Sequence, residues 1–169
     1  MTAIPMSTRA RRTDAVWVAL TITAFVWGAA FENTTGYSGG QTLAPALHGT
    51  PGEAIAIFVR NTTACLLLIA FAHRPASTPR LLSGAGESLC GAIPWGTAVF
   101  GGILAAHPDG LQYFPHAPAE LLAAALAGAW PLCARSIPPT RRATAQRAAI
   151  VVALLAVAAL LETFAVPHA

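Results

Sequence analysis

Five long apolar runs, separated by short polar segments, constrain this chain more than any other feature of its sequence. A helix needs about 20 apolar residues to cross a hydrocarbon layer roughly 30 Å thick, and runs of about 17–25 residues meet this requirement. Unpaired backbone groups are costly in lipid, and the runs lack the alternation of membrane barrel strands. The sequence therefore predicts an all-α, polytopic integral membrane bundle of about five transmembrane helices. The runs lie at residues 15–31, 54–73, 88–106, 118–134 and 148–166.

Composition favours the same class. Only 10% of the residues are charged, whereas a soluble domain carries about 25%, so this chain could not cover its surface in water. We expect residues 1–14 to be a cytoplasmic N-terminal segment and residues 15–169 to form one five-helix transmembrane domain in contact with membrane lipids. The net charge of +3 comes from arginines in short segments beside apolar runs. Membrane topology explains such arginines, so we expect no nucleic-acid partner.

The arginines also predict an orientation. The arginines outside the runs precede the first run or lie between runs two and three or four and five, and the segments on the opposite side contain none. Positively charged segments stay in the cytoplasm. We therefore expect a multi-pass protein of the bacterial cytoplasmic membrane, with its N-terminus cytoplasmic and its C-terminus extracytoplasmic. The first run, at 17 residues, is longer than the apolar region of a signal peptide, about 7–15 residues, and we expect it to remain as an anchor.

Small residues recur every four positions in two neighbouring runs. Small side chains let helix backbones approach closely in lipid, which gives the van der Waals contacts that hold membrane helices together. Because a short segment joins the third and fourth runs, we expect these two helices to pack antiparallel against each other. We also expect Pro94 to kink its helix, and Pro131 to kink or end its own. The ridges consist of Ala98, Gly102 and Ala106 in the third run and Ala119, Ala123 and Ala127 in the fourth.

Four ionisable residues fall near the extracytoplasmic ends of the predicted spans: Glu32, Arg60, Glu120 and Glu162. Ionisable groups within a span are expensive and raise a functional hypothesis by default. We expect Arg60 to be neutralised by the carboxylate of Glu120 or Glu162. Two interpretations stay open: interfacial or structural pairing, and a functional cavity that faces outward.

Catalytic, metal and cofactor signals are weak. Motifs of hydrolases and nucleotide-binding proteins are missing, so no residue is predicted to be catalytic and no cofactor is expected. The histidines and acids around residues 107–120 match no metal-site spacing, and no metal is expected. The cysteines form no CxxC pair, so we expect buried, reduced thiols at Cys65, Cys90 and Cys133.

Residues 114–121, Phe-Pro-His-Ala-Pro-Ala-Glu-Leu, precede a helix rich in Ala and Gly. This stretch resembles the signature of the stage II sporulation protein M family, Pro-His-Gly-x-x-Glu entering such a helix. The segment 57–61, Ile-Phe-Val-Arg-Asn, is similar to the family's Phe-x-x-Asn, and the resemblance covers about residues 55–134. Ala117 replaces the usual Gly, and Asp109-Gly110 stands for the Asn-Gly pair common in the family. The resemblance makes Asn61, His116 and Glu120 the family-type positions, with roles unassigned.

The resemblance implies a non-enzymatic membrane scaffold or accessory subunit that supports an extracytoplasmic peptidoglycan-remodelling or peptide-maturation and export complex. Its partners would be other membrane or extracytoplasmic proteins, such as a hydrolase or ABC transporter components, in a homo- or hetero-oligomer. An alternative is a transport or immunity protein that binds a peptide or an ion in a polar cavity of the outer leaflet. A membrane-embedded enzyme, such as a peptide cyclase, is a third hypothesis. The candidate functional polar cluster consists of Glu32, Arg60, Asn61, His116, Glu120 and Glu162.

Overall fold

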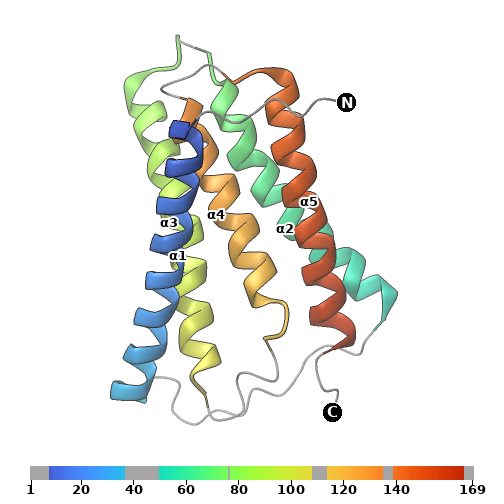
Figure 1. Ribbon diagram of the computed structural model, residues 1–169. Coiled ribbons are helices and arrows are strands. Elements are labelled where there is room, and N and C mark those ends of the chain that lie inside the picture. Colours follow the sequence, from blue (N-terminus) through green and yellow to red (C-terminus); the bar gives the residue numbers. More distant parts are fainter. Residues whose placement is uncertain (1–7, 37–49, 76, 108–113, 135–138, 166–169) are drawn as a thin grey trace.

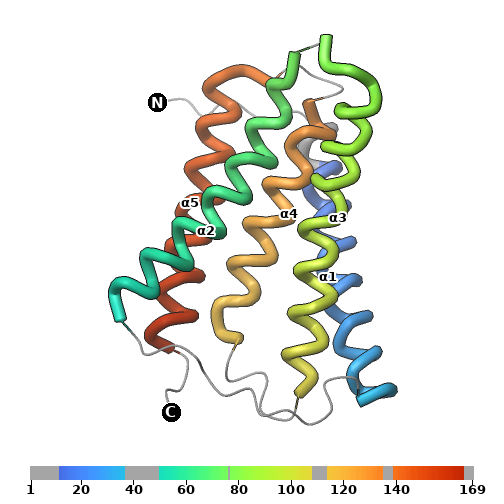
Figure 2. Tube along the Cα trace, turned by 180° about the vertical axis from the view of Figure 1, so that it is seen from behind, coloured from blue at the N-terminus to red at the C-terminus, as the bar shows by residue number. Residues whose placement is uncertain are grey.

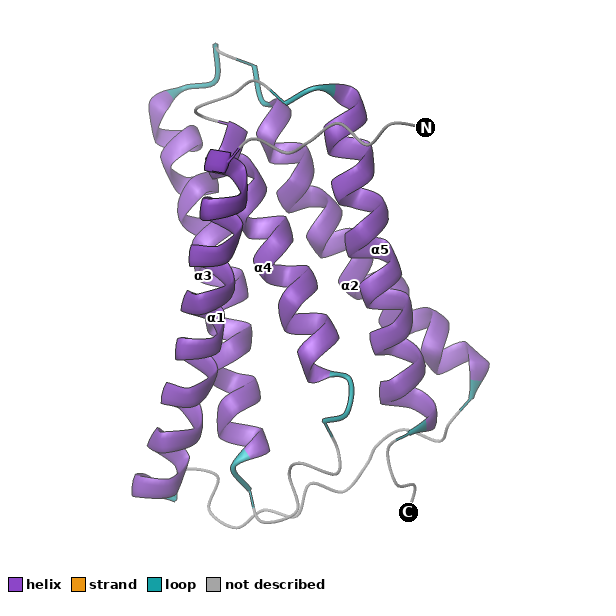
Figure 3. Ribbon diagram, in the orientation of Figure 1, coloured by secondary structure: helices purple, strands orange, loops and turns teal. Residues whose placement is uncertain are grey.

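The computed structural model describes residues 8–36, 50–75, 77–107, 114–134 and 139–165, and within these ranges it contains helices and no strand. Five helices are long and apolar enough to cross a membrane, and they run roughly alongside one another (Figure 1; Figure 3). The predicted all-α class and the number of long apolar helices are confirmed. The elements are α1 (Thr8–Thr35), α2 (Pro51–Ala70), the 3-10 turn η1 (Phe71–His73), α3 (Arg80–Ala105), α4 (Ala117–Ala134) and α5 (Arg141–Phe164).

Several helices extend beyond the apolar runs that predicted them. The third begins at Arg80 instead of residue 88, the fifth at Arg141 instead of 148, and α1 includes residues of the predicted cytoplasmic segment. Hydropathy marks only the part of a helix suited to lipid, whereas the helix itself continues until its end is capped. The Thr50 hydroxyl and the Glu53 carboxylate form a capping box at the start of α2. Similarly, the Thr140 hydroxyl accepts a hydrogen bond from the Ala143 amide, at 3.1 Å, at the start of α5.

Helix α4 is the centre of the bundle. It lies between the pair α1 and α3 on one side and the pair α2 and α5 on the other, and both views show it flanked in this way (Figures 1 and 2). In the most apolar 18-residue stretch of each helix, 56% of the residues are buried in α4 and 17% in α1. Its central stretch consists of Ala and Gly with few larger residues, and small side chains allow neighbouring helices to approach on every side.

Helices α3 and α4 pack against each other, as expected, but the closest contact of the α3 ridge is with α1. A Cβ atom added at Gly102 of α3 would overlap the Phe25 carbonyl oxygen of α1, and one added at Gly28 of α1 would overlap the Val99 carbonyl. The ridge therefore allows close packing on α1. Helix α4 meets α3 elsewhere, where Gly128 leaves room for the Cys90 carbonyl oxygen. Sequence proximity favoured α4, but the complementary glycine on α1 decides the closest contact.

The proline prediction is settled only for the fourth helix. Pro131 is buried inside α4, which continues to Ala134, so Pro131 does not end the helix. Pro94 also lies inside its helix, α3. Proline removes one backbone donor, and neighbouring helices make this tolerable in apolar bundles.

A hydrophobic core fills the space where α2, α4 and α5 meet. Branched side chains of α2 and α5 pack there against alanines and Trp130 of α4. Cys65 and Cys90 are buried, Cys133 is half-buried, and all three are free thiols, as predicted. The core residues are Cys65, Leu68, Ile69, Cys90, Ala123, Ala127, Trp130, Val151 and Leu155.

Candidate functional site

The bundle has two ends, which we name by the residues that distinguish them. At the Glu120 end, α1, α3 and α5 finish and α2 and α4 begin; at the Arg147 end, the directions are reversed (Figure 1). The orientation expected from the arginines would place the Glu120 end outside the cell.

At the Glu120 end, α2 and α4 are joined by a polar contact in the interior of the bundle. Asn61 lies on the α2 stripe that includes the buried residues Ile57 and Cys65, and its side-chain amide donates a hydrogen bond to Glu120 Oε1. Glu120 lies in the first turn of α4. His116 precedes it by one turn, with its Nε2 atom 3.9 Å from Glu120 Oε2. The three family-type positions thus meet, although Asn61 and Glu120 are 59 residues apart.

Arg60 reaches this contact indirectly. Its Nε atom donates a hydrogen bond of 3.1 Å to Asn61 Oδ1. Among the described residues, it forms no ion pair with Glu120 or Glu162, so the predicted direct salt bridge is absent. Successive helix residues point about 100° apart, so Arg60 and Asn61 leave α2 in different directions, and the Arg60 side chain is exposed.

Glu162 adds a second carboxyl group from α5. The charges of Glu120 and Arg60 both act on it, which places two acidic groups and one basic group near one another. Three buried polar atoms at this end of the helices have no hydrogen-bond partner among the described residues: Thr62 Oγ1, His116 Nδ1 and Thr163 Oγ1. Among the described residues, these three atoms at the Glu120 end are therefore buried without a hydrogen-bond partner.

The sixth predicted residue is placed apart. Glu32 is buried near the end of α1, and α1 lies across α4 from α2 and α5 (Figure 1). The structure thus gathers Arg60, Asn61, His116, Glu120 and Glu162 between α2, α4 and α5, and it places Glu32 at the same end on the other flank. We call these five gathered residues the outer cluster.

The His116 side chain is almost fully buried. Burial lowers the pKa of its imidazole below the usual value, because a charged ring loses its hydration there.

No group of three or more His, Cys, Asp or Glu side chains suited to a metal ion occurs among the described residues. Asp109 lies outside the described residues.

Sequence reasoning missed an ion pair at the opposite end. The Arg147 guanidinium of α5 binds the Asp14 carboxylate of α1 through two hydrogen bonds of 2.9 and 2.8 Å. Arg147 also donates to the Leu126 carbonyl oxygen at 3.3 Å, and it lies over the Trp130 ring, 4.8 Å from its centroid. The pair therefore connects α1, α4 and α5.

A sequence signal for this pair did exist. Asp14 and Arg147 each stand directly before an apolar run, which puts both at the same depth. Arg147 was interpreted only as a topology signal, yet its side chain is only 5% exposed.

Three further contacts connect the turn η1 and the residue that follows it to α3 and α5 at this end. Arg74 pairs with Glu87 of α3 and donates to the Ser83 hydroxyl at 3.0 Å. His73 of η1 is hydrogen-bonded to Thr144 of α5 at 2.8 Å. These contacts link consecutive and distant helices beside the buried ion pair.

Comparison of the chain with known protein families, with characterised proteins and with solved structures finds no match.

Proposed function

We propose that this chain is a multi-pass protein of the bacterial cytoplasmic membrane that acts as a non-enzymatic scaffold or accessory subunit. It would support an extracytoplasmic peptidoglycan-remodelling or peptide-maturation and export complex, as its resemblance to the sporulation protein M family implies. Five apolar helices fit such a membrane placement. The arginine distribution favours a cytoplasmic N-terminus.

One observation carries the proposal: Asn61, Glu120 and His116 converge. These are the positions that the resemblance selects, and they come from segments far apart in the sequence. Their contact fixes the start of α4 against α2, and α4 in turn contacts every other long helix. A partner that binds at the Glu120 end would therefore meet a surface whose shape depends on the Glu120 carboxylate.

The test compares Glu120→Gln with wild type by co-purification from native membranes. Gln keeps the size of Glu and can accept the Asn61 hydrogen bond, so we expect normal expression and helix content. We expect recovery of the co-purified complex to fall about tenfold, which corresponds to about 1.4 kcal/mol of binding free energy. Glu53→Gln is the matched control, because it removes a carboxylate at the same end and Gln still completes a capping box. A fully active Glu120→Gln variant with an intact complex would contradict the proposal.

The second candidate is a transport or immunity protein that binds a peptide or an ion at the outer cluster. The observation that favours it is the excess of acid, since Glu120 and Glu162 act on each other beside one arginine. Acidic groups within a span often mark ion pathways. Retained co-purification in Glu120→Gln, together with lost peptide resistance or transport in cells, would favour this candidate over the scaffold.

A further inference from the structure

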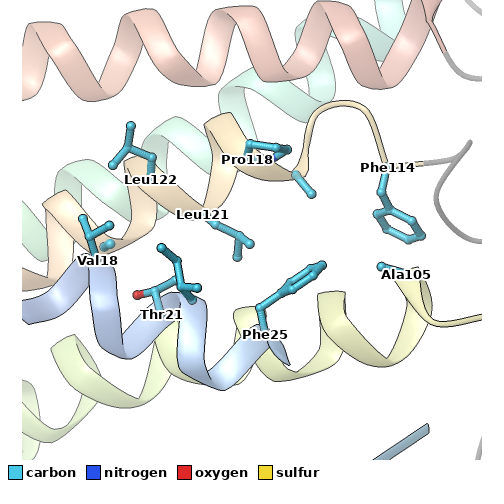
Figure 4. Close-up of a pocket in the computed structure, with 11 residues that line it drawn as sticks. Val18, Thr21, Phe25, Ala105, Phe114, Pro118, Leu121 and Leu122 are labelled. Atoms are coloured by element: carbon cyan, nitrogen blue, oxygen red, sulfur yellow. The ribbon is translucent and has the colours of Figure 1, made fainter. Parts of the chain in front are cut away.

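An apolar pocket of about 420 Å³ opens between α1 and α4, next to the end of α3. Figure 4 shows Val18, Thr21 and Phe25 of α1 opposite Pro118, Leu121 and Leu122 of α4, with Phe114 at one end. The α1 wall, from Val18 to Phe25, is about 10 Å long at 1.5 Å per residue. The pocket is therefore elongated along the bundle axis. It lies on the flank of α4 away from α2, whereas Asn61 contacts α4 from the α2 side.

The described residues that line the pocket include no charged or amide side chain. Among them Thr21 alone has a hydroxyl, and this group donates a hydrogen bond of 2.9 Å to the Trp17 carbonyl of its own helix. A peptide or a polar metabolite entering here would lose its hydrogen bonds to water without replacement. The chemistry of the walls thus selects a hydrocarbon.

Access to the pocket is from the side of the bundle. Ile22 and Leu122 both line the pocket and are exposed, at 58% and 37%, so the pocket is continuous with the outer apolar surface of α1 and α4. In the membrane placement proposed above, that surface faces lipid. A molecule dissolved in the bilayer is then the one that can reach the pocket.

We propose that this pocket binds one acyl chain of a phospholipid from the leaflet at the Glu120 end, which rests on the membrane placement of the proposed function. Lipid tails are as apolar as leucine, so transfer from bilayer to pocket gains no hydrophobic free energy. The acyl chain prefers the pocket to the surrounding bilayer because it contacts the walls of two helices there. Van der Waals attraction increases with the number of close atom pairs. The volume falls within the range of about 300–1,000 Å³ for small-molecule sites. The chain lies parallel to α1, with its headgroup beyond Phe114.

The test uses the full chain in phosphatidylcholine nanodiscs that contain a phosphatidylcholine with a diazirine on one acyl chain. After illumination, mass spectrometry maps the crosslinked residues. We expect labelling of Thr21, Phe25 and Leu121 to exceed labelling of the exposed Val59 and Val157 about tenfold, which corresponds to a preference of about 1.4 kcal/mol. Val59 and Val157 serve as internal controls because they lie on α2 and α5, outside the pocket.

Two variants fill the pocket, Ala125→Phe and Leu121→Trp, and Val157→Phe introduces the same Phe side chain outside the pocket. We expect the pocket labelling to disappear in the first two and to persist in the third. If a filled variant does not fold, the set of crosslinked residues in the wild-type protein still tests the proposal.

Equal labelling of the pocket residues and of the controls Val59 and Val157 would overturn the proposal. It would show that the probe contacts the pocket only as it contacts the rest of the exposed surface. Stronger labelling by a diazirine-bearing isoprenoid than by the acyl probe would overturn the acyl assignment. Absence of labelling on all helices would overturn the membrane placement itself. Loss of the co-purified complex in Glu120→Gln tests the scaffold separately, because Glu120 is not among the residues that line the pocket.

Discussion

The two ends of the bundle accommodate buried charge in opposite ways. At the Arg147 end, the guanidinium of Arg147 and the carboxylate of Asp14 satisfy each other through two hydrogen bonds of 2.9 and 2.8 Å. At the Glu120 end, Arg60 donates a hydrogen bond to the Asn61 side-chain amide. The positive charge of Arg60 acts on both the Glu120 and the Glu162 carboxyl groups. Buried charges are tolerated when they are paired and hydrogen-bonded. The first end meets this condition and the second meets it only in part.

The difference separates a structural region from a candidate functional one. At the Arg147 end, ion pairs and a hydrogen bond between polar side chains connect helices, and Trp130 Nε1 is a buried atom without a hydrogen-bond partner among the described residues. At the Glu120 end, His116 Nδ1 and Thr163 Oγ1 are buried without a hydrogen-bond partner among the described residues, so polar capacity remains for a ligand or a partner. Incompletely compensated polar groups within a span commonly mark function. The four predictions below test this contrast.

The largest effect is expected for Arg147→Gln. Removing one partner of a buried ion pair leaves the other charge uncompensated, which costs about 3–5 kcal/mol. We expect the free energy of unfolding in detergent, measured by circular dichroism during denaturant titration, to fall by about this amount. Arg141→Gln, an exposed arginine of the same helix, should change it by less than about 0.5 kcal/mol. Equal stability of the two variants would show that the Asp14 pair is not a structural link.

A smaller loss is expected for Gly102→Ala. The new Cβ would meet the backbone of α1 at Phe25, and overpacking of this kind costs about 1–3 kcal/mol. Gly96→Ala on the same helix is the control, because nothing lies within 4 Å of its Cβ position and alanine favours helix by about 1 kcal/mol. In the same titration, the free energy of unfolding should therefore fall for Gly102→Ala and rise for Gly96→Ala. A stabilised Gly102→Ala variant would refute the close packing of α3 on α1.

Asn61→Ala should lower the free energy of unfolding by less than Arg147→Gln or Gly102→Ala does. Hydrogen bonds between membrane helices contribute about 0.6 kcal/mol on average and about 1.7 at most, and Asn61 contributes one such bond to Glu120. We expect a small decrease in unfolding free energy but a large loss of co-purified complex, as in Glu120→Gln. If Asn61→Ala destabilises the protein as much as Arg147→Gln does, the Glu120 end is also structural and the contrast between the ends fails.

The smallest effect is a dependence on pH. Burial lowers the pKa of His116 in the folded state from about 6.5 in an unfolded chain. Folding therefore favours the neutral ring, and this contribution is complete above about pH 6.5 and decreases as pH falls through the unfolded pKa toward the folded one. We expect the melting temperature to fall between about pH 7 and pH 5.5 and to fall less in His116→Gln. An identical decrease in both proteins would assign the effect to other groups.

The sequence by itself determined that the chain forms five long apolar helices and where each lies approximately. Apolar runs are local properties, since each segment must match a thickness of hydrocarbon irrespective of its neighbours. The same local reasoning identified Arg60, Glu120 and Glu162, because ionisable residues near the ends of apolar runs are visible in the sequence alone, whereas Asn61 and His116 were selected by the resemblance to the sporulation protein M family. It could not show that Asn61 stands between Arg60 and Glu120, because that depends on the rotation of α2 toward α4.

Only the tertiary structure decided which helix faces meet. It placed α4 at the centre, selected α1 as the close partner of the α3 ridge, and joined Asp14 to Arg147 across 133 residues. An apolar environment makes every lipid-facing side chain equally acceptable, so hydrophobicity cannot rank the possible pairings. Steric fit at glycines and the compensation of buried charge rank them instead, and both require that the two helices already lie side by side.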